Sequence, residues 1–247
     1  MSTQYGWRAR VGHISPALLD TSAEECRKLL PPGVLHVGLS ISQPVQRMAP
    51  DELDQAGRLM VDAARRLAAE EVDVIVAGGA PATARQGPAA DDALLGALRE
   101  ASGLPCTTAN RAVVEALDAL GLRRVVVVSP FVEARNEEIR AYLAAVGVTV
   151  VATRGLGLPR NVDIARQSAA TPYQMARALV RETPDVDGVY IACPRWPVVD
   201  IVEALETDLR KPVVAGVTAM MWHCLRLIGV GDPPRGYGRL METLRGA

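Results

Sequence analysis

The chain has 247 residues, of which 49% are hydrophobic and 22% are charged, and its formal net charge is −1. A chain of this length forms one or two domains, and its apolar fraction excludes a disordered protein. A net charge close to zero offers no basic surface for nucleic acid or for an anionic membrane. No apolar run approaches the roughly 18 residues that a membrane-spanning helix needs. We therefore expect neither nucleic acid nor a membrane as a partner.

Cysteine and histidine usage narrows the class further. The first residues lack the apolar stretch of a secretory signal, so we expect a cytoplasmic protein with free thiols. No CxxC or HxxxH spacing occurs, and we expect no metal site. The four cysteines are Cys26, Cys106, Cys193 and Cys224. The three histidines are His13, His36 and His223. His13 lies inside the first predicted strand, where a core position is the favoured interpretation.

Short runs rich in β-branched residues alternate along the chain with longer amphipathic segments. The predicted strands are 10–15, 34–41, 72–77, 124–129, 149–152, 188–192 and 212–215. The predicted helices space apolar residues at three and four: 52–71, 91–102, 109–120, 133–146, 172–182, 198–209 and 218–227. This alternation is typical of an α/β fold with parallel sheets and right-handed crossovers.

An internal repeat organises these elements. Arg10–Pro16 resembles Arg124–Pro130, and Val72–Gly79 resembles Val186–Cys193, both at an offset of 114 (124 − 10 and 186 − 72). This period is the length of a small domain and far exceeds a solenoid repeat. We predict two similar Rossmann-like α/β domains related by a pseudo-twofold axis. The first comprises residues 1–107 plus 217–247, and the second comprises residues 108–216.

The repeat also predicts where a ligand binds. Parallel sheets bind ligands outside the carboxyl ends of their strands, so two facing sheets would enclose a site in the cleft between them. The loops at those ends contain Ser15, Gly79, Ala80, Pro81, Ser129, Phe131, Cys193, Pro194 and Arg195.

The twin strand motifs, the run Asn161–Ser168 and the closing segment Lys211–Val214 resemble the aspartate/glutamate racemase superfamily. Within it, the chain is similar to the maleate isomerase and arylmalonate decarboxylase branch. The resemblance implies two facing α/β domains with a cysteine at each equivalent strand end. Each cysteine would serve one face of a small carboxylate substrate, and neither a metal nor an organic cofactor would be used.

Position by position, the second cysteine of that family corresponds to Cys193, and the first corresponds to Gly79. Glycine at the first position is the pattern of arylmalonate decarboxylases. Asn161 matches an asparagine that helps hold a substrate carboxylate. The chain departs from the family at three positions, where hydroxyl residues and a tyrosine are replaced by Ala80, Pro81 and Phe131.

The residues at these positions restrict the chemistry. A thiol at Cys193 can exchange a proton at carbon, and a helix beginning at Pro194 would lower its pKa. Gly79 supplies neither acid nor base, which disfavours two-thiol racemisation and leaves proton delivery to one face. Arg195 could pair with a carboxylate, and Phe131 could form an apolar wall.

A carbanion formed by loss of carbon dioxide would delocalise into a carboxylate, and it needs hydrogen-bond donors. The predicted donors are the backbone N–H groups of residues 78–80 and the side chains of Ser15, Thr83, Ser129 and Asn161.

We predict a cofactor-independent decarboxylase of a small malonate-like carboxylate, in which Cys193 protonates an enediolate. One alternative is an isomerase or racemase with a non-cysteine second base. Another is a ligand-binding relative that has lost its catalytic groups. A homodimer is the default expectation for such an enzyme.

Overall fold

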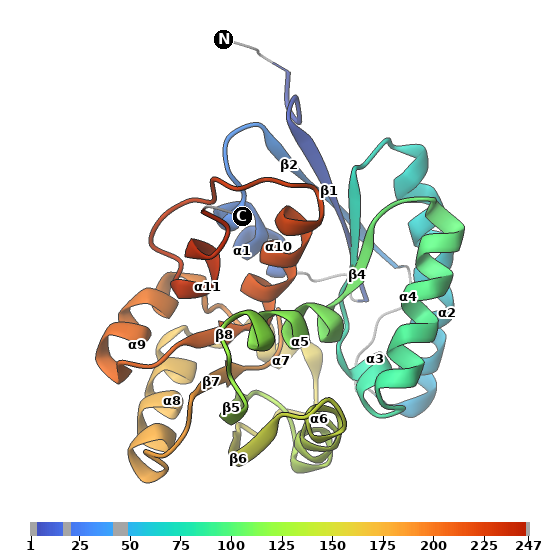
Figure 1. The fold of residues 1–247 in the computed structure, drawn as a ribbon. Helices are drawn as coiled ribbons and strands as arrows, with labels where there is room; N and C mark the ends of the chain where they lie inside the picture. Colours follow the sequence, from blue (N-terminus) through green and yellow to red (C-terminus); the bar gives the residue numbers. More distant parts are fainter. Residues whose placement is uncertain (1–3, 17–20, 42–48, 246–247) are drawn as a thin grey trace.

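The computed structural model describes residues 4–16, 21–41 and 49–245, and it contains two parallel sheets (Figure 1). The first sheet has the order β2-β1-β3-β4 and the second has the order β6-β5-β7-β8, so the two topologies are identical. The first consists of β1 (Ala9–Ser15), β2 (Val34–Ser40), β3 (Val74–Ala77) and β4 (Cys106–Thr108). The second consists of β5 (Arg124–Ser129), β6 (Thr149–Gly155), β7 (Gly188–Ile191) and β8 (Val213–Ala215). The predicted α/β class with two similar domains is confirmed.

Helices connect the strands and cover the sheets. Those of the first half are α1 (Ser22–Leu29), α2 (Pro50–Ala69), α3 (Pro81–Ala84), α4 (Pro88–Ser102) and α5 (Ala109–Ala119). Those of the second half are α6 (Glu133–Ala145), α7 (Asn161–Ala165), α8 (Ala170–Glu182), the 3₁₀ turn η1 (Val199–Ile201), α9 (Val202–Leu209), α10 (Gly216–Leu227) and α11 (Arg239–Glu242). No helix within the described ranges is both long and apolar enough to cross a membrane.

The repeated motifs begin equivalent strand pairs. The backbone N–H of Arg10 donates to Oδ2 of Asp73 at 2.7 Å, and the N–H of Arg124 donates to Oδ2 of Asp187 at 2.7 Å. Donors from the backbone of Arg123 and Arg124 also lower the pKa of the Asp187 carboxyl. Each aspartate thus accepts a backbone N–H at the start of the neighbouring strand, β1 or β5. The two strands of each pair therefore begin at the same level in both sheets.

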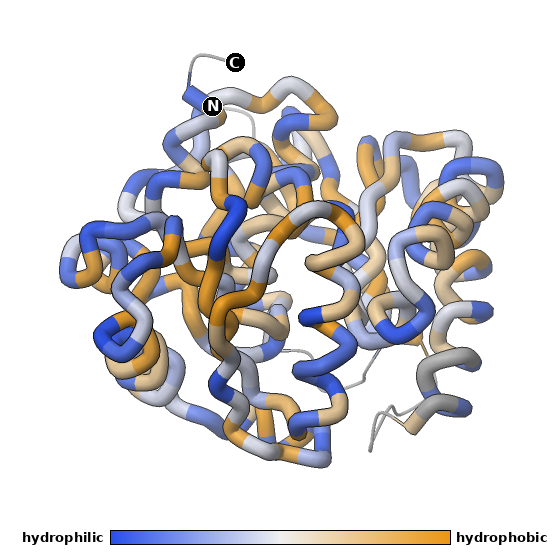
Figure 2. The backbone as a smooth tube through the Cα atoms, turned by 60° about the horizontal axis from the view of Figure 1, so that its bottom comes forward, coloured by the Kyte–Doolittle hydropathy of each residue, from blue (hydrophilic) through white to orange (hydrophobic). Residues whose placement is uncertain are grey.

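The last long helix crosses between the halves of the chain. α10 follows β8 of the second sheet, yet it contacts α1, β3 and β4 of the first. It also packs along α5, and the two helices lie side by side in Figure 1. Hydrophobic segments run through the interior of the molecule, whereas hydrophilic ones lie mainly at its periphery (Figure 2). The division of the chain at 107/108 and 216/217 stays a prediction, with which the course of α10 agrees.

Two local predictions are wrong. The sequence predicts no strand over residues 106–108, but these residues form β4, which pairs with β3. No helix starts at Pro194, because the chain makes a turn in which the N–H of Trp196 donates to the carbonyl of Cys193 at 3.2 Å. Helical structure begins only at Val199.

Candidate active site

A pocket lies at the carboxyl ends of the central strands of both sheets, and it encloses about 560 Å³ including its mouth. Its walls come from the ends of β1 and β3, the starts of α1 and α7, and the loops after β5 and β7. The lining residues are His13, Ser15, Pro16, Ser22, Ala56, Gly78, Gly79, Ala80, Pro81, Ala82, Phe131, Asn161, Cys193, Pro194 and Arg195. The site therefore joins segments that are far apart in the sequence.

Cys193 and Gly79 occupy equivalent positions in the two halves. The residue before each one donates its N–H to the neighbouring central strand: Gly78 to Ile14 and Ala192 to Val128, both at 2.8 Å. Cys193 is 5% exposed and lines the same pocket as Gly79. A thiol from one strand end and a bare backbone from the other thus line one cavity.

The backbone has the same unusual conformation at both positions. Its φ angle is +85° at Gly79 and +81° at Cys193. Glycine adopts this region readily, whereas a residue with a Cβ is destabilised there by roughly 1–2 kcal/mol. Cys193 is one of only three non-glycine residues with positive φ in the described part of the chain. Strained residues cluster at functional sites because the surrounding structure must hold them there.

The turn beside Gly79 offers hydrogen-bond donors to a ligand. The predicted donor at Gly78 is already used, because its N–H bonds to the carbonyl of Ile14. In the described ranges, the N–H groups of Gly79 and Ala80 donate no hydrogen bond within the chain. Two adjacent backbone donors at the edge of a pocket can stabilise a developing negative charge.

Two of the predicted side-chain donors lie in the pocket and two do not. Ser15 and Asn161 are buried and line it. Ser129 is buried behind it and bonds to the Asn136 side chain and to the N–H of Phe131. Thr83 donates to a buried carboxylate on α4. Ser129 and Thr83 therefore stabilise the loops and lie outside the pocket.

Arg195 and Phe131 give the pocket a charged side and an apolar side. Arg195 is 6% exposed and, among the described residues that line the pocket, is the only arginine or lysine, so it favours an anionic ligand. Its carbonyl accepts a hydrogen bond from Oγ1 of Thr21 at 2.7 Å, which joins the loop after β7 to the start of α1. The side chain of Phe131 is buried and has no hydrogen-bonding group.

A buried carboxylate supports the loop after Gly79. Asp91 is fully buried and accepts from Oγ1 of Thr83 and Oγ1 of Thr108, each at 2.7 Å, and from the Tyr142 hydroxyl at 3.2 Å. Asn110 donates to Thr83 and to the carbonyl of Ala80. Burial, followed by the charge of Asp91, raises the pKa of Tyr142. The network fixes α3 against α4, α5 and α6.

A second buried carboxylate supports the loop after Cys193. Glu25 on α1 is 6% exposed, and its Oε2 accepts from the N–H of Val198 at 2.7 Å and of Val199 at 2.8 Å. These are backbone donors of the second half of the chain at the start of a helical segment. The carboxylate therefore joins the first sheet's helix to the segment that leads away from the thiol.

Sequence reasoning missed four of the residues that line the pocket. The sequence favours a core position for His13, which is 1% exposed, but this residue also lines the cavity. Ser22, Ala56 and Ala82 belong to helices that follow the first, second and third strands. The only available signal was their proximity in sequence to strand ends or to helix starts.

The comparisons with known proteins agree with this geometry. The family model for arylmalonate decarboxylase matches residues 34–241. Arylmalonate decarboxylase from Bordetella bronchiseptica is 35% identical over 196 residues, which cover 79% of this chain and 82% of that protein. Maleate isomerase from Nocardia farcinica is 31% identical over 132 residues, covering 53% of this chain and 52% of the relative.

Solved structures of the same branch match nearly the whole chain. A liganded arylmalonate decarboxylase variant has a TM-score of 0.87 and 30% identity, covering 95% of this chain and 99% of that one. The glycine and the cysteine exchanged in that variant are 114 positions apart, as Gly79 and Cys193 are. Maleate isomerase from Pseudomonas putida S16, at 24% identity and a TM-score of 0.86, shares the fold. The chain belongs to the arylmalonate decarboxylase family.

Proposed function

We propose that the protein is a cofactor-independent decarboxylase of a small malonate-like dicarboxylate, in which Cys193 protonates the intermediate. One observation carries the proposal: the two equivalent strand ends place a single thiol and a glycine against the same pocket. A reaction that needs one proton at one face of a carbon requires one donor only. Similarity to arylmalonate decarboxylase supports this interpretation.

In the proposed reaction, the bond between the α-carbon and one carboxylate breaks, and carbon dioxide leaves. The electron pair moves into the remaining carboxylate, which becomes an enediolate. The thiol of Cys193 then gives its proton to the α-carbon, and the thiolate recovers a proton from water. The overall change consumes one proton and yields carbon dioxide and a monocarboxylate.

Charge and donors in the pocket fit the stages of this reaction. In this proposal Arg195 attracts the dianionic substrate, and Asn161 and Ser15, which line the pocket, bind the carboxylate that is retained. The N–H groups of Gly79 and Ala80 can stabilise the enediolate, whose negative charge on oxygen grows as carbon dioxide leaves. Loss of the departing carboxylate is favoured on the apolar side near Phe131, where a carboxylate is poorly solvated.

The test uses an α-methyl-α-arylmalonate, because protonation of its enediolate creates a stereocentre. We expect carbon dioxide release, a product enriched in one enantiomer, and one deuterium at the α-carbon when the reaction runs in D₂O. Cys193→Ala should lower kcat by at least about 100-fold, the lower range for loss of a general acid. Normal turnover by Cys193→Ala would refute the mechanism.

A second candidate is isomerisation of a small carboxylate with a non-cysteine base. The observation that favours it is His13, a titratable side chain that lines the pocket together with Cys193. It predicts deuterium exchange into a carboxylate substrate, or conversion of maleate to fumarate, without loss of carbon dioxide. His13→Asn would abolish such exchange, whereas decarboxylation by Cys193 would survive this substitution.

A further inference from the structure

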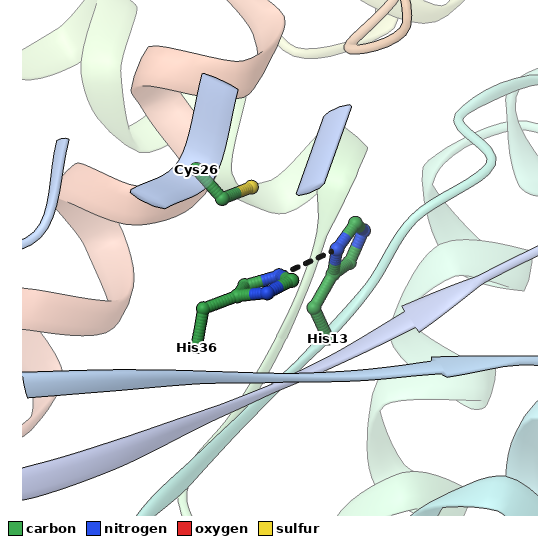
Figure 3. Close-up of side chains that lie close together, drawn as sticks. All are labelled: His13, Cys26 and His36. Carbon is green, nitrogen blue, oxygen red and sulfur yellow. Dashed lines mark hydrogen bonds between the residues drawn. The ribbon is translucent and has the colours of Figure 1, made fainter. Parts of the chain in front are cut away.

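Beside the pocket, three side chains able to bind a metal meet on one face of the first sheet (Figure 3). His13 comes from β1, His36 comes from the adjacent β2, and Cys26 comes from α1, which covers this face. In the parallel pairing, Val11 lies opposite His36 and Gly38 lies opposite His13. Because alternate residues of a strand share a face, the two imidazoles project to the same side. Cys26 points toward them from above.

The distances fit a small metal ion. Nδ1 of His13 lies 3.2 Å from Nε2 of His36. Two nitrogens bound to one tetrahedral zinc at about 2.0–2.1 Å are roughly 3.3 Å apart, which is almost the separation observed. Each residue, including Cys26, offers a ligand atom within 4.8 Å of the others.

The three side chains are buried away from solvent, and a glycine beside His36 leaves space for its ring. The exposed fractions are 1% for His13, 0% for Cys26 and 9% for His36. A Cβ on Gly38 would stand 3.2 Å from Cε1 of His36, so any larger residue would press against this imidazole. Two imidazoles and one thiol are ligands that suit zinc, and they suit magnesium or calcium poorly.

We propose that His13, Cys26 and His36 bind one zinc ion per chain. The ion displaces the thiol proton of Cys26, which is released to solvent. The proton between the two imidazoles moves to the far nitrogen of the ring that carries it, so both rings bind zinc as neutral ligands. Zinc affinity therefore falls at acid pH, where protons compete for the thiolate and for the imidazoles. The ligand set leaves one tetrahedral position for water or another small ligand, because it supplies three protein atoms.

This site would act on the pocket through His13. A metal at Nδ1 requires the remaining ring proton to sit on Nε2. That Nε2 atom lies 3.2 Å from where a Cβ on Gly78 would stand, beside the turn that lines the pocket. Zinc would thus fix the tautomer of His13, which lines the pocket, and make its Nε2 atom a hydrogen-bond donor. Without the ion, either nitrogen of His13 can carry the proton.

The test uses Co²⁺ as a spectroscopic probe in the full-length protein, after treatment with a chelator. We expect one Co²⁺ per chain, with visible bands of tetrahedral cobalt and a thiolate-to-cobalt charge-transfer band in the near ultraviolet. Stoichiometric Zn²⁺ should displace it and remove both sets of bands. This measurement does not depend on enzymatic activity.

Two variants and one control identify the ligands. Cys26→Ser should lose the charge-transfer band, and His36→Gln should weaken cobalt binding by more than the roughly 10–100-fold that loss of a supporting group causes. Cys193→Ser, which removes the thiol in the pocket, should leave the spectrum unchanged. Circular dichroism of each variant establishes that it is folded.

Several outcomes would overturn the proposal. Absence of stoichiometric binding, or binding without the thiolate band, would reduce the cluster to a buried histidine pair beside a cysteine. A thiolate band that survives Cys26→Ser but disappears in Cys193→Ser would place the ion in the pocket. If Cys26→Ser does not fold, an unchanged cobalt affinity in His36→Gln would refute the site.

Discussion

Moving the thiol to the other strand end should invert the product. In the double variant Gly79→Cys with Cys193→Ser, the proposed proton donor leaves one of two equivalent positions and enters the other. Both positions line one pocket, and each follows the equivalent strand, β3 or β7, of its own sheet. The enediolate would then be protonated from the opposite face. We expect the opposite enantiomer from an α-methyl-α-arylmalonate.

The stability penalty follows from the backbone at Gly79. Its φ of +85° disfavours any side chain by about 1–2 kcal/mol. A Cβ there would lie 3.0 Å from Cγ of Pro16 and 3.2 Å from Cε of Met60. The end of Met60 can move aside, but the Pro16 ring is stiffer, and such overpacking adds about 1–2 kcal/mol. A total of about 2–4 kcal/mol corresponds to a Tm lower by roughly 4–16 °C for a chain of this length.

The assay combines chiral chromatography of the product with thermal denaturation followed by circular dichroism. The matched control is Cys193→Ser alone, which should have little activity and no strong enantiomeric preference. Retention of the wild-type configuration in the double variant would refute the assignment of the two faces. An enantiomerically pure product from the single variant would show that the proton comes from another group.

Three further outcomes are expected. Because the φ of Cys193 is +81°, Cys193→Gly should be more stable than Cys193→Ala by about 1 kcal/mol in urea denaturation, the reverse of the usual order. Asp91→Ala should destabilise by at least about 1–3 kcal/mol in the same assay, since it leaves buried hydroxyl donors without their acceptor. Burial, and then the charges of nearby arginines, lowers the pKa of His223 from 6.5 to about 4. The unfolded chain therefore binds more protons between these values, and stability should fall from pH 6.5 to 4 by up to about 3 kcal/mol more in wild type than in His223→Gln. Equal pH dependence of these two proteins would contradict this explanation.

Much of the fold could be predicted because the repeat lies in the strands themselves. In the sequence, a strand buried on both faces is a continuous apolar run. Asp73 and Asp187 immediately precede β3 and β7, and they mark where these two strands begin. Two such motifs at one offset implied two equal sheets. Short elements gave no comparable signal: β4 has three residues, and α1 has eight, of which two buried ones, Ser22 and Glu25, are polar.

The pocket could be predicted only where it follows from the strand ends. Ser15, Gly79 and Cys193 end or follow central strands, and the structure brings them together. Ser129 also ends a central strand, but its hydroxyl donates a hydrogen bond to Asn136 on α6 and lies behind the pocket. Such competition between partners depends on side chains from another element, which spacing along the chain does not reveal. The contact between His13 and His36 could not be predicted for the same reason, because it depends on how β1 pairs with β2.

The conformation of Cys193 bears on whether its thiol is functional or merely fills space. A buried cysteine that only packs against its neighbours has no need of a positive φ, and glycine at the equivalent position avoids that strain. The segment that follows is held by Glu25 and Thr21 from the other half of the chain, so the surrounding structure maintains the strained turn. Since burial of one small side chain offsets little more than this penalty, packing alone is a weak reason for the residue. A thiol that must face a substrate supplies a sufficient one.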